Sequence, residues 1–178
     1  MSVNSVVVLS AVRSAVGTFS GSLSSIEPAE LAGQVLTQGI AASGVEADKY
    51  ESIIMGNTIP TESRFPYVAR VASIQAGMSL NSTAMALNRL CSSGLQAVVS
   101  SAQGIMLGDH ELAIGGGVEN MSRGGYLSPA MRAGARMGDS SMIDMMVATL
   151  TDPFGVGHMG ITAENLASKW DISREQQD

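Results

Sequence analysis

Cys91 is the single cysteine among 178 residues, and its surroundings favour nucleophilic chemistry. An apolar run ends near Asn88 and a helical pattern begins near Ser93 and Gly94, which predicts a strand–turn–helix corner around the thiol. The free amides and the dipole at a helix N-terminus stabilise a thiolate and can hold a developing oxyanion. Composition alone favours a buried structural cysteine, which behaves as a small hydrophobe, and it is the corner position that favours a nucleophile.

A cysteine nucleophile needs a base, and the chain offers two histidines, His110 and His158. His110 is expected in a solvated turn at the opposite end of the sheet from Cys91. His158 lies among glycines, where it could line a pocket or belong to a simple loop. One cysteine and two distant histidines indicate no metal site, and residues 115–117 are expected to form a close-packed turn rather than a phosphate loop. The sequence therefore contains no complete cysteine–histidine pair that its pattern identifies.

Strands and helices alternate in the pattern up to about residue 118. Apolar runs predict strands at residues 6–9, 53–55, 85–87 and 112–114. Helical spacing predicts helices at residues 30–42, 68–76 and 94–107. Such alternation predicts an α/β fold with a parallel-rich sheet flanked by helices, whose sites lie beyond the carboxyl ends of the strands.

The character of the sequence changes after Glu119. Residues 122–160 are rich in Gly, Met, Ser and Asp, with one helical pattern at 141–150, and predict an irregular cap or loop lobe. We therefore expect an α/β domain at residues 1–121 and a lobe at 122–178. A helix is predicted at 162–170 with Thr162 as its N-cap, and Ser173 with Gln176 predicts a capping box. The chain is expected to end inside a starting helix at Asp178, as a fragment would.

Composition and charge exclude several classes of protein. Ten basic and 16 acidic residues give a net charge of −6, and the scattered basic residues argue against a nucleic-acid partner. The 45% hydrophobic content excludes an intrinsically disordered chain. No stretch approaches the roughly 18 apolar residues of a membrane span, and residues 1–10 lack the basic start of a signal peptide. We expect a cytoplasmic protein without a membrane partner.

Four blocks, in order along nearly the whole chain, resemble those of thiolases. Residues 88–94 are similar to the family's Asn-x-x-Cys-x-Ser-Gly nucleophile segment, and residues 11–19 to its opening strand and turn. Residues 115–122 are similar to its Gly-Gly-x-Glu-x-Met-Ser block, and residues 158–165 to its His-Met-Gly-x-Thr-Ala-Glu-Asn block. The resemblance is to acetyl-CoA acetyltransferases, also called β-ketothiolases, and it covers only their N-terminal part.

This resemblance implies a fold and an acyl-transfer chemistry. The fold would be a thiolase-like βαβαβαβ half, followed by the truncated start of an inserted loop domain that mediates tetramerisation. Cys91 would carry the acyl group as a thioester while β-ketoacyl-CoA, such as acetoacetyl-CoA, is formed or cleaved in fatty acid or polyhydroxyalkanoate metabolism. His158 and Met159 would line the pantetheine and acyl end of the pocket, with Leu150 nearby, in binding roles. Coenzyme A thioesters would be substrates, with no permanently bound cofactor and no metal.

The resemblance also implies what this chain does not contain. Thiolases are longer, and their second half supplies a Gly-His-Pro histidine, a Cys-x-Gly cysteine and an Asn-Glu-Ala-Phe asparagine. None of these blocks occurs in residues 1–178, so this chain alone is expected to be inactive. Two other functions stay open: a non-catalytic thiolase-like dimerisation or scaffold module, and a related condensing enzyme such as a ketoacyl synthase.

The resemblance further implies a homodimer or homotetramer in the parent protein. Residues 53–76 and 85–87 would form the dimer interface, and residues 122–138 would join dimers. The sequence contributes small residues in the helix at 68–76, which permit close approach. The alternative is that Ala72 and Ala76 pack on their own sheet.

Overall fold

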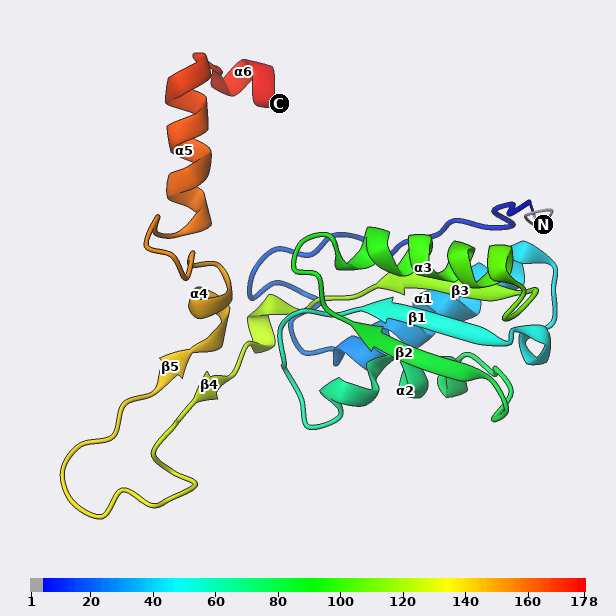
Figure 1. Ribbon diagram of the computed structural model, residues 1–178, viewed down its shortest axis with the longest axis horizontal. Helices are drawn as coiled ribbons and strands as arrows, with labels where there is room; N and C mark the ends of the chain where they lie inside the picture. Colours follow the sequence, from blue (N-terminus) through cyan, green and yellow to red (C-terminus); the bar gives the residue numbers. More distant parts are fainter. Residues whose placement is uncertain (1–4) are drawn as a thin grey trace. The chain divides into compact units, whose positions relative to one another are not determined.

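The computed structural model describes residues 5–178, which form two compact units (Figure 1). The first unit ends at Arg123, and the second comprises Gly124–Asp178. Among the described residues, no helix is long and apolar enough to cross a membrane, and no cluster of three or more potential metal ligands occurs.

A parallel three-stranded sheet forms the centre of the first unit. Its strands are β1 (Ser52–Gly56), β2 (Thr83–Leu87) and β3 (Ala113–Gly117), in the order β2-β1-β3. Figure 1 shows α3 (Ser93–Leu107) on one face and α1 (Pro28–Ser43) with α2 (Val68–Gln75) on the other. Short 3-10 turns occur at η1 (Ala47–Lys49), η2 (Phe65–Tyr67) and η3 (Met121–Arg123). The predicted α/β class, with helices on both faces of a parallel sheet, is confirmed.

Local signals explain the boundaries of α1. Pro28 occupies the first turn, where its fixed φ suits a helix and its missing N–H costs nothing. Gly44 ends the helix in the left-handed region, at φ 74°, which a residue without Cβ adopts freely. The helix buries an apolar stripe that meets Ile53 of β1 and Val68 and Ala72 of α2 in one core. This stripe comprises Ala29, Ala32, Leu36 and Ile40.

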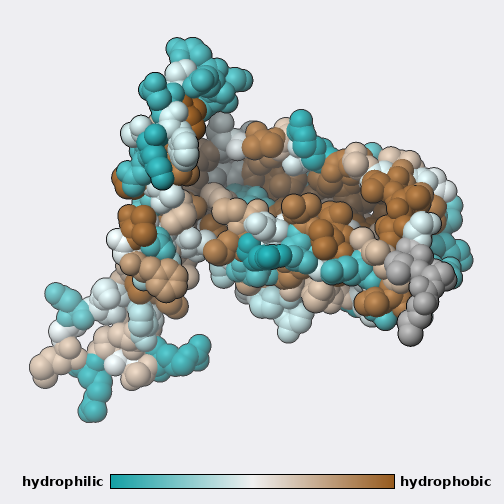
Figure 2. Space-filling model, turned by 45° about the horizontal axis from the view of Figure 1, so that its top comes forward, coloured by the Kyte–Doolittle hydropathy of each residue, from teal (hydrophilic) through white to brown (hydrophobic). Residues whose placement is uncertain are grey.

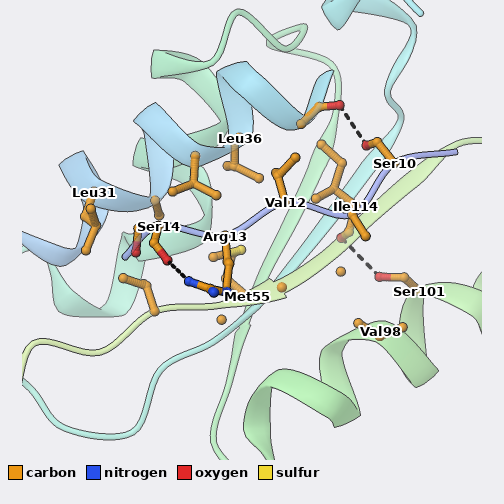
Figure 3. A pocket seen from close by; sticks show the side chains of 18 of the residues that line it. Ser10, Val12, Arg13, Ser14, Leu31, Leu36, Met55, Val98, Ser101 and Ile114 are labelled. Carbon is orange, nitrogen blue, oxygen red and sulfur yellow. Dashed lines mark hydrogen bonds between the residues drawn. The ribbon is translucent and has the colours of Figure 1, made fainter. Parts of the chain in front are cut away.

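The strand predicted at residues 6–9 is wrong. The segment has no strand assignment, and Val7 and Val8 are 73% and 78% exposed. A pocket of ≈ 940 Å³ lies between this segment, α1, β3 and α3 (Figure 3). A ladder requires a neighbouring strand about 4.8 Å away, and here the pocket takes that place. The apolar β-branched run therefore supplies strand propensity without a hydrogen-bonding partner.

The turn predicted at residues 115–117 is also wrong, although its close packing is confirmed. These glycines are the last three residues of β3. A Cβ on Gly115 would lie 2.6 Å from the Cα of Val98, and one on Gly117 would lie 3.1 Å from the Cα of Gly94. The glycines thus let α3 lie directly on the backbone of the sheet.

The second unit consists of short elements. Its strands β4 (Tyr126–Leu127) and β5 (Ile143–Asp144) pair antiparallel, followed by α4 (Met145–Thr149), α5 (Met159–Trp170) and α6 (Arg174–Gln177). The helix predicted at 141–150 is shorter than expected because Asp144 caps it, accepting hydrogen bonds from the N–H groups of Met146 and Val147. The capping box of Ser173 and Gln176 is confirmed.

Thr162 is not the N-cap of α5, contrary to the sequence-based expectation. The helix begins one turn earlier, at Met159, because the Nδ1 atom of His158 accepts a hydrogen bond from the N–H of Gly160 at 3.0 Å. The helix is therefore capped by an imidazole nitrogen and not by the expected threonine hydroxyl. This places His158 at the first turn of α5.

Candidate functional site

Cys91 lies at the predicted corner between β2 and α3. Its side chain is exposed, β2 ends four residues earlier at Leu87, and α3 begins two residues later at Ser93. The preceding residue, Leu90, has φ 50°, in the left-handed region that branched residues rarely adopt. A sharp turn at Leu90 thus presents the thiol at the amino end of α3.

The hydroxyl of Ser93 forms hydrogen bonds with two backbone groups of the turn, one on Arg89 and one on Leu90. It accepts a hydrogen bond from the N–H of Arg89 at 2.8 Å and donates one to the C=O of Leu90 at 2.6 Å. The same carbonyl also accepts the N–H of Ser93 at 3.0 Å. Ser93 is 4% exposed, so these bonds are shielded from competing water.

A second set of contacts joins the turn to the end of β1. The side chain of Asn88 accepts the N–H of Leu90 at 2.9 Å and donates to the C=O of Thr58 at 3.3 Å. The hydroxyl of Thr58 in turn donates to the C=O of Leu90 at 3.2 Å. The carboxyl ends of β1 and β2 therefore hold one another through polar side chains.

Glu119 fixes the loop that carries Thr58. Its carboxylate accepts hydrogen bonds from the N–H groups of Thr58 and Ile59, the latter at 3.3 Å. Asn120, next in the chain, donates to three backbone carbonyls in the segment before α1, those of Leu23, Ser24 and Ile26. In the sequence both residues belong to the block at 115–122, where no local pattern indicates which carbonyls and amides they bond.

Close packing beneath the turn gives a testable stability effect at Gly56. A Cβ at this position would lie 2.5 Å from the carbonyl carbon of Ser93, so alanine must push α3 away from β1. We expect Gly56→Ala to lower the free energy of unfolding by about 1–3 kcal/mol, as overpacking does. The matched control is Gly125→Ala, whose Cβ would meet nothing within 4 Å. Denaturant unfolding that ranks the two variants equally would contradict the packing.

His110 lies far from Cys91, as expected, but it is half-buried rather than solvated. Its ring packs on Gly104, and its Nε2 atom lies 3.3 Å from the C=O of Ser101. Ser101 is about 12 Å along α3 from Ser93 at 1.5 Å per residue, so this ring cannot reach the thiol. Beside it, the N–H groups of Glu111 and then Leu112 lower the pKa of Glu51.

The structure brings together the three residues expected to bind substrate, all in the second unit. Residue 151 forms an isolated antiparallel bridge with His158, and the N–H of Met159 donates to the C=O of Leu150 at 2.8 Å. His158 is exposed, Met159 is 42% exposed, and Leu150 is half-buried. The Nδ1 atom of His158 accepts the N–H of Gly160, so this ring nitrogen serves the start of α5 and Nε2 is the ring nitrogen not used by the helix.

The pocket beside the N-terminal segment is separate from Cys91. Figure 3 shows Val12, Leu36 and Ile114 directed into it from the N-terminal segment, α1 and β3. Neither Cys91 nor any of the three expected binding residues lines it. Its volume therefore identifies no substrate site by itself.

Comparisons with known proteins identify the family of this chain. A family model described as the N-terminal domain of thiolase matches residues 6–178. The chain belongs to the thiolase family. It is 54% identical over 173 residues to the β-ketothiolase BktB of Cupriavidus necator, covering 97% of this chain and 44% of that protein. It is 42% identical to an acetyl-CoA acetyltransferase of Pseudomonas aeruginosa, again covering 97% of this chain and 44% of the relative.

Solved thiolase structures share this fold. The acetyl-CoA acetyltransferase of Bacillus anthracis superposes with a TM-score of 0.87 at 38% identity, over 96% of this chain and 43% of that one. Human mitochondrial 3-ketoacyl-CoA thiolase in complex with CoA superposes with a TM-score of 0.84 at 34% identity, over 90% and 41% of the two chains. This thiolase chain thus spans less than half the length of the relatives it matches.

Proposed function

We propose that the complete gene product containing this chain is an acetyl-CoA C-acetyltransferase that forms or cleaves β-ketoacyl-CoA through an acyl thioester on Cys91. The observation that carries the proposal is the exposed thiol on a left-handed turn at the amino end of α3. Family membership supports it, as do relatives named β-ketothiolase and acetyl-CoA acetyltransferase.

The proposed condensation transfers an acetyl group twice, first from CoA to Cys91 and then from Cys91 to a second acetyl-CoA. The Cys91 thiolate attacks the carbonyl carbon of acetyl-CoA, forming a C–S bond, and the CoA thiolate leaves and takes a proton. A second acetyl-CoA loses an α-proton to a base outside this chain, and its carbanion attacks the acetyl thioester. Acetoacetyl-CoA leaves and the Cys91 thiolate is regenerated. Amides at the start of α3 are suited to the negative charge that develops on the attacked carbonyl.

We propose that Leu150, His158 and Met159 contact the pantetheine and acyl part of the CoA substrate. Their support is the shared location at the junction of α4 and α5, together with the exposed Met159 side chain and the Nε2 atom of His158, which the helix does not use. An apolar thioether suits an acyl chain, and an imidazole suits an amide of the pantetheine arm. A cytoplasmic location and a role in fatty acid or polyhydroxyalkanoate metabolism stay predictions.

Substrate comparison distinguishes this function from its two alternatives. The complete gene product should cleave acetoacetyl-CoA when free CoA is added, which is measured by the loss of absorbance of the β-ketoacyl substrate. A ketoacyl synthase would instead require a malonyl group on a carrier, and a scaffold module would turn over neither. Absence of thiolysis in a folded complete protein would contradict the proposal.

We also propose that the complete protein forms a homodimer through the free edge of β2, and that residues 122–138 join dimers into a tetramer. The expectation that the small residues of α2 form the interface needs correction. Ala72 is 0% exposed and Ala76 is 8% exposed, and both belong to the unit's own core. What remains available is the sheet edge at β2, where Met85 is 46% exposed, together with Leu80 in the turn before β2, which is 81% exposed. An open edge strand with apolar side chains is a surface that proteins normally cover.

Light scattering on the complete gene product tests this assembly. We expect a dimer or tetramer that buries more than roughly 1,000 Å² per interface. Met85→Lys should shift it towards the monomer, because it places a charge in the interface. Met137→Lys is the control: this side chain is 96% exposed in the second unit and should at most reduce a tetramer to a dimer. A monomeric wild-type protein at micromolar concentration would show that the interface is wrong.

A second apolar surface of the first unit, on α3, is also exposed to solvent. The outer side of α3 exposes Leu95 and Leu107 at 71% and 79%, and Figure 2 shows apolar side chains over much of this unit. Monomeric proteins rarely leave contiguous patches of this kind in water. We propose that protein outside this chain packs on α3, since the relatives are more than twice as long.

A further inference from the structure

The backbone turn before Cys91 is held by hydrogen bonds rather than by packing. Leu90 has φ 50°, yet its side chain is 59% exposed and so is not held by a core. A left-handed leucine is strained and persists only where its surroundings determine it. Hydrogen bonds to the backbone on either side of Leu90 must therefore maintain this conformation.

Ser93 supplies the shortest of these bonds. Its buried hydroxyl accepts from the N–H of Arg89 at 2.8 Å and donates to the C=O of Leu90 at 2.6 Å. Thr58 reaches the same carbonyl at 3.2 Å from the end of β1. The peptide group that joins Leu90 to Cys91 is thus fixed through its oxygen.

The orientation of that peptide group decides where the Cys91 amide points. The described residues contain no cis peptide bond, so the N–H of Cys91 points opposite to the C=O of Leu90. Because that oxygen faces the buried Ser93 hydroxyl, the N–H of Cys91 points away from Ser93. A rotation of the peptide would move both the amide and the thiol.

We propose that Ser93 is a positioning residue that aims the thiol and backbone amide of Cys91 by holding Leu90 in its left-handed conformation. The inference rests on the proposed function, in which Cys91 is the acyl acceptor. Ser93 is not a helix cap: the N-cap of α3 is Ser92, which has no side-chain capping bond. Without the Ser93 hydroxyl, its own N–H still bonds to Leu90 at 3.0 Å and the N–H of Gln96 to Ser92 at 2.9 Å. The helix therefore persists while the turn loosens.

The chain offers a matched control at Ser73. This serine is 0% exposed, and its hydroxyl donates at 2.8 Å to the carbonyl three residues earlier, that of Arg70. Ser93 makes the same bond to Leu90, also three residues earlier. Ser73→Ala and Ser93→Ala thus remove the same chemical group from equally buried positions, but only the second adjoins Cys91.

The experiment measures the rate of iodoacetamide alkylation of Cys91 at one fixed pH, together with steady-state kinetics, in the complete gene product. Ser93→Ala should slow alkylation, because the thiol of Cys91 is no longer held in one orientation. We expect kcat/KM to fall roughly 10–100-fold, mainly through kcat and with KM nearly unchanged, as small misplacements of a reacting group do. Ser73→Ala should leave the alkylation rate and kcat unchanged. Should Ser93→Ala fail to fold, Thr58→Val removes another donor to the same carbonyl and should lower the alkylation rate and kcat by a smaller amount.

The outcomes separate this inference from the proposed function. An unchanged alkylation rate and kcat in Ser93→Ala, or in folded Thr58→Val if Ser93→Ala is insoluble, would overturn the positioning role. Equal effects of Ser73→Ala and Ser93→Ala would overturn it as well, by showing a general loss of stability. A wild-type protein that keeps full activity after complete alkylation of Cys91 would overturn the proposed function and this inference together.

Discussion

Cys91→Ala is expected to reduce acetoacetyl-CoA cleavage by the complete gene product roughly 10⁴-fold or more, since no other group can form the thioester. Cys91 is the single cysteine of this chain and its side chain is exposed, so the substitution removes a reactive atom without opening a cavity. The measurement is the initial rate of thiolysis at saturating acetoacetyl-CoA and CoA.

Thermal unfolding is the control for this variant. An exposed side chain contributes little to the core, so the unfolding midpoint should stay within a few degrees of the wild type. Cys91→Ser should be nearly as inactive, because a hydroxyl at the same position is a far weaker nucleophile than a thiolate. Full activity in either folded variant would remove Cys91 from the mechanism.

A polypeptide of residues 1–178 alone is expected to show no measurable thiolysis. Condensation and cleavage both require proton transfer, and each missing general acid or base costs on the order of 10²–10⁴-fold. His110, the histidine of the first unit, is bound to the far part of α3 beside Ser101 and Gly104. No histidine of that unit therefore lies near enough to Cys91 to take its proton.

Alkylation provides the control for the truncated polypeptide. Its Cys91 should still react with iodoacetamide if the turn at Leu90 forms, which separates a folded but incomplete site from an unfolded chain. Circular dichroism should show the helices. Robust cleavage of acetoacetyl-CoA by a preparation whose mass shows that it ends at Asp178 would contradict the prediction.

Much of the fold follows from short-range patterns in the sequence. Pro28 and Gly44 mark the ends of α1 because each suits a backbone conformation that other residues resist. Ser173 and Gln176 predict their capping box in the same way. The corner at Cys91 was predictable because a β-rich apolar run ends just before it and a helical stripe begins just after it.

Interactions between distant segments were not predictable from such patterns. The run at residues 6–9 has the composition of a buried strand, but composition does not show that a pocket separates it from β3. Three consecutive glycines in β3 suggested a turn. Glycine is needed there because the strand contacts α3 at residues 94–98, and that contact is not visible in the local sequence. His158 as the cap of α5 had no signal that outweighed the nearby threonine.

The hydrogen bonds that hold the turn at Leu90 were also not predictable from the sequence. A left-handed leucine has no sequence signature, since glycine or asparagine is the usual residue at such a position. The bonds from Ser93 and Thr58 to Leu90 become visible only when β1, β2 and α3 are placed together. The acyl-transfer chemistry itself came from the resemblance of four blocks, because the residues alone identified a reactive cysteine without a base.

The most direct test of the central claim is to find the acyl group on Cys91. The complete gene product is incubated with acetyl-CoA without further acceptor, quenched in acid, digested and analysed by mass spectrometry. We expect an acetyl thioester on the peptide that contains Cys91, and its loss when free CoA is added before the quench. An enzyme that exchanges acetyl groups with CoA while Cys91 stays unmodified, or that carries the acetyl group on another residue, would contradict the proposed mechanism.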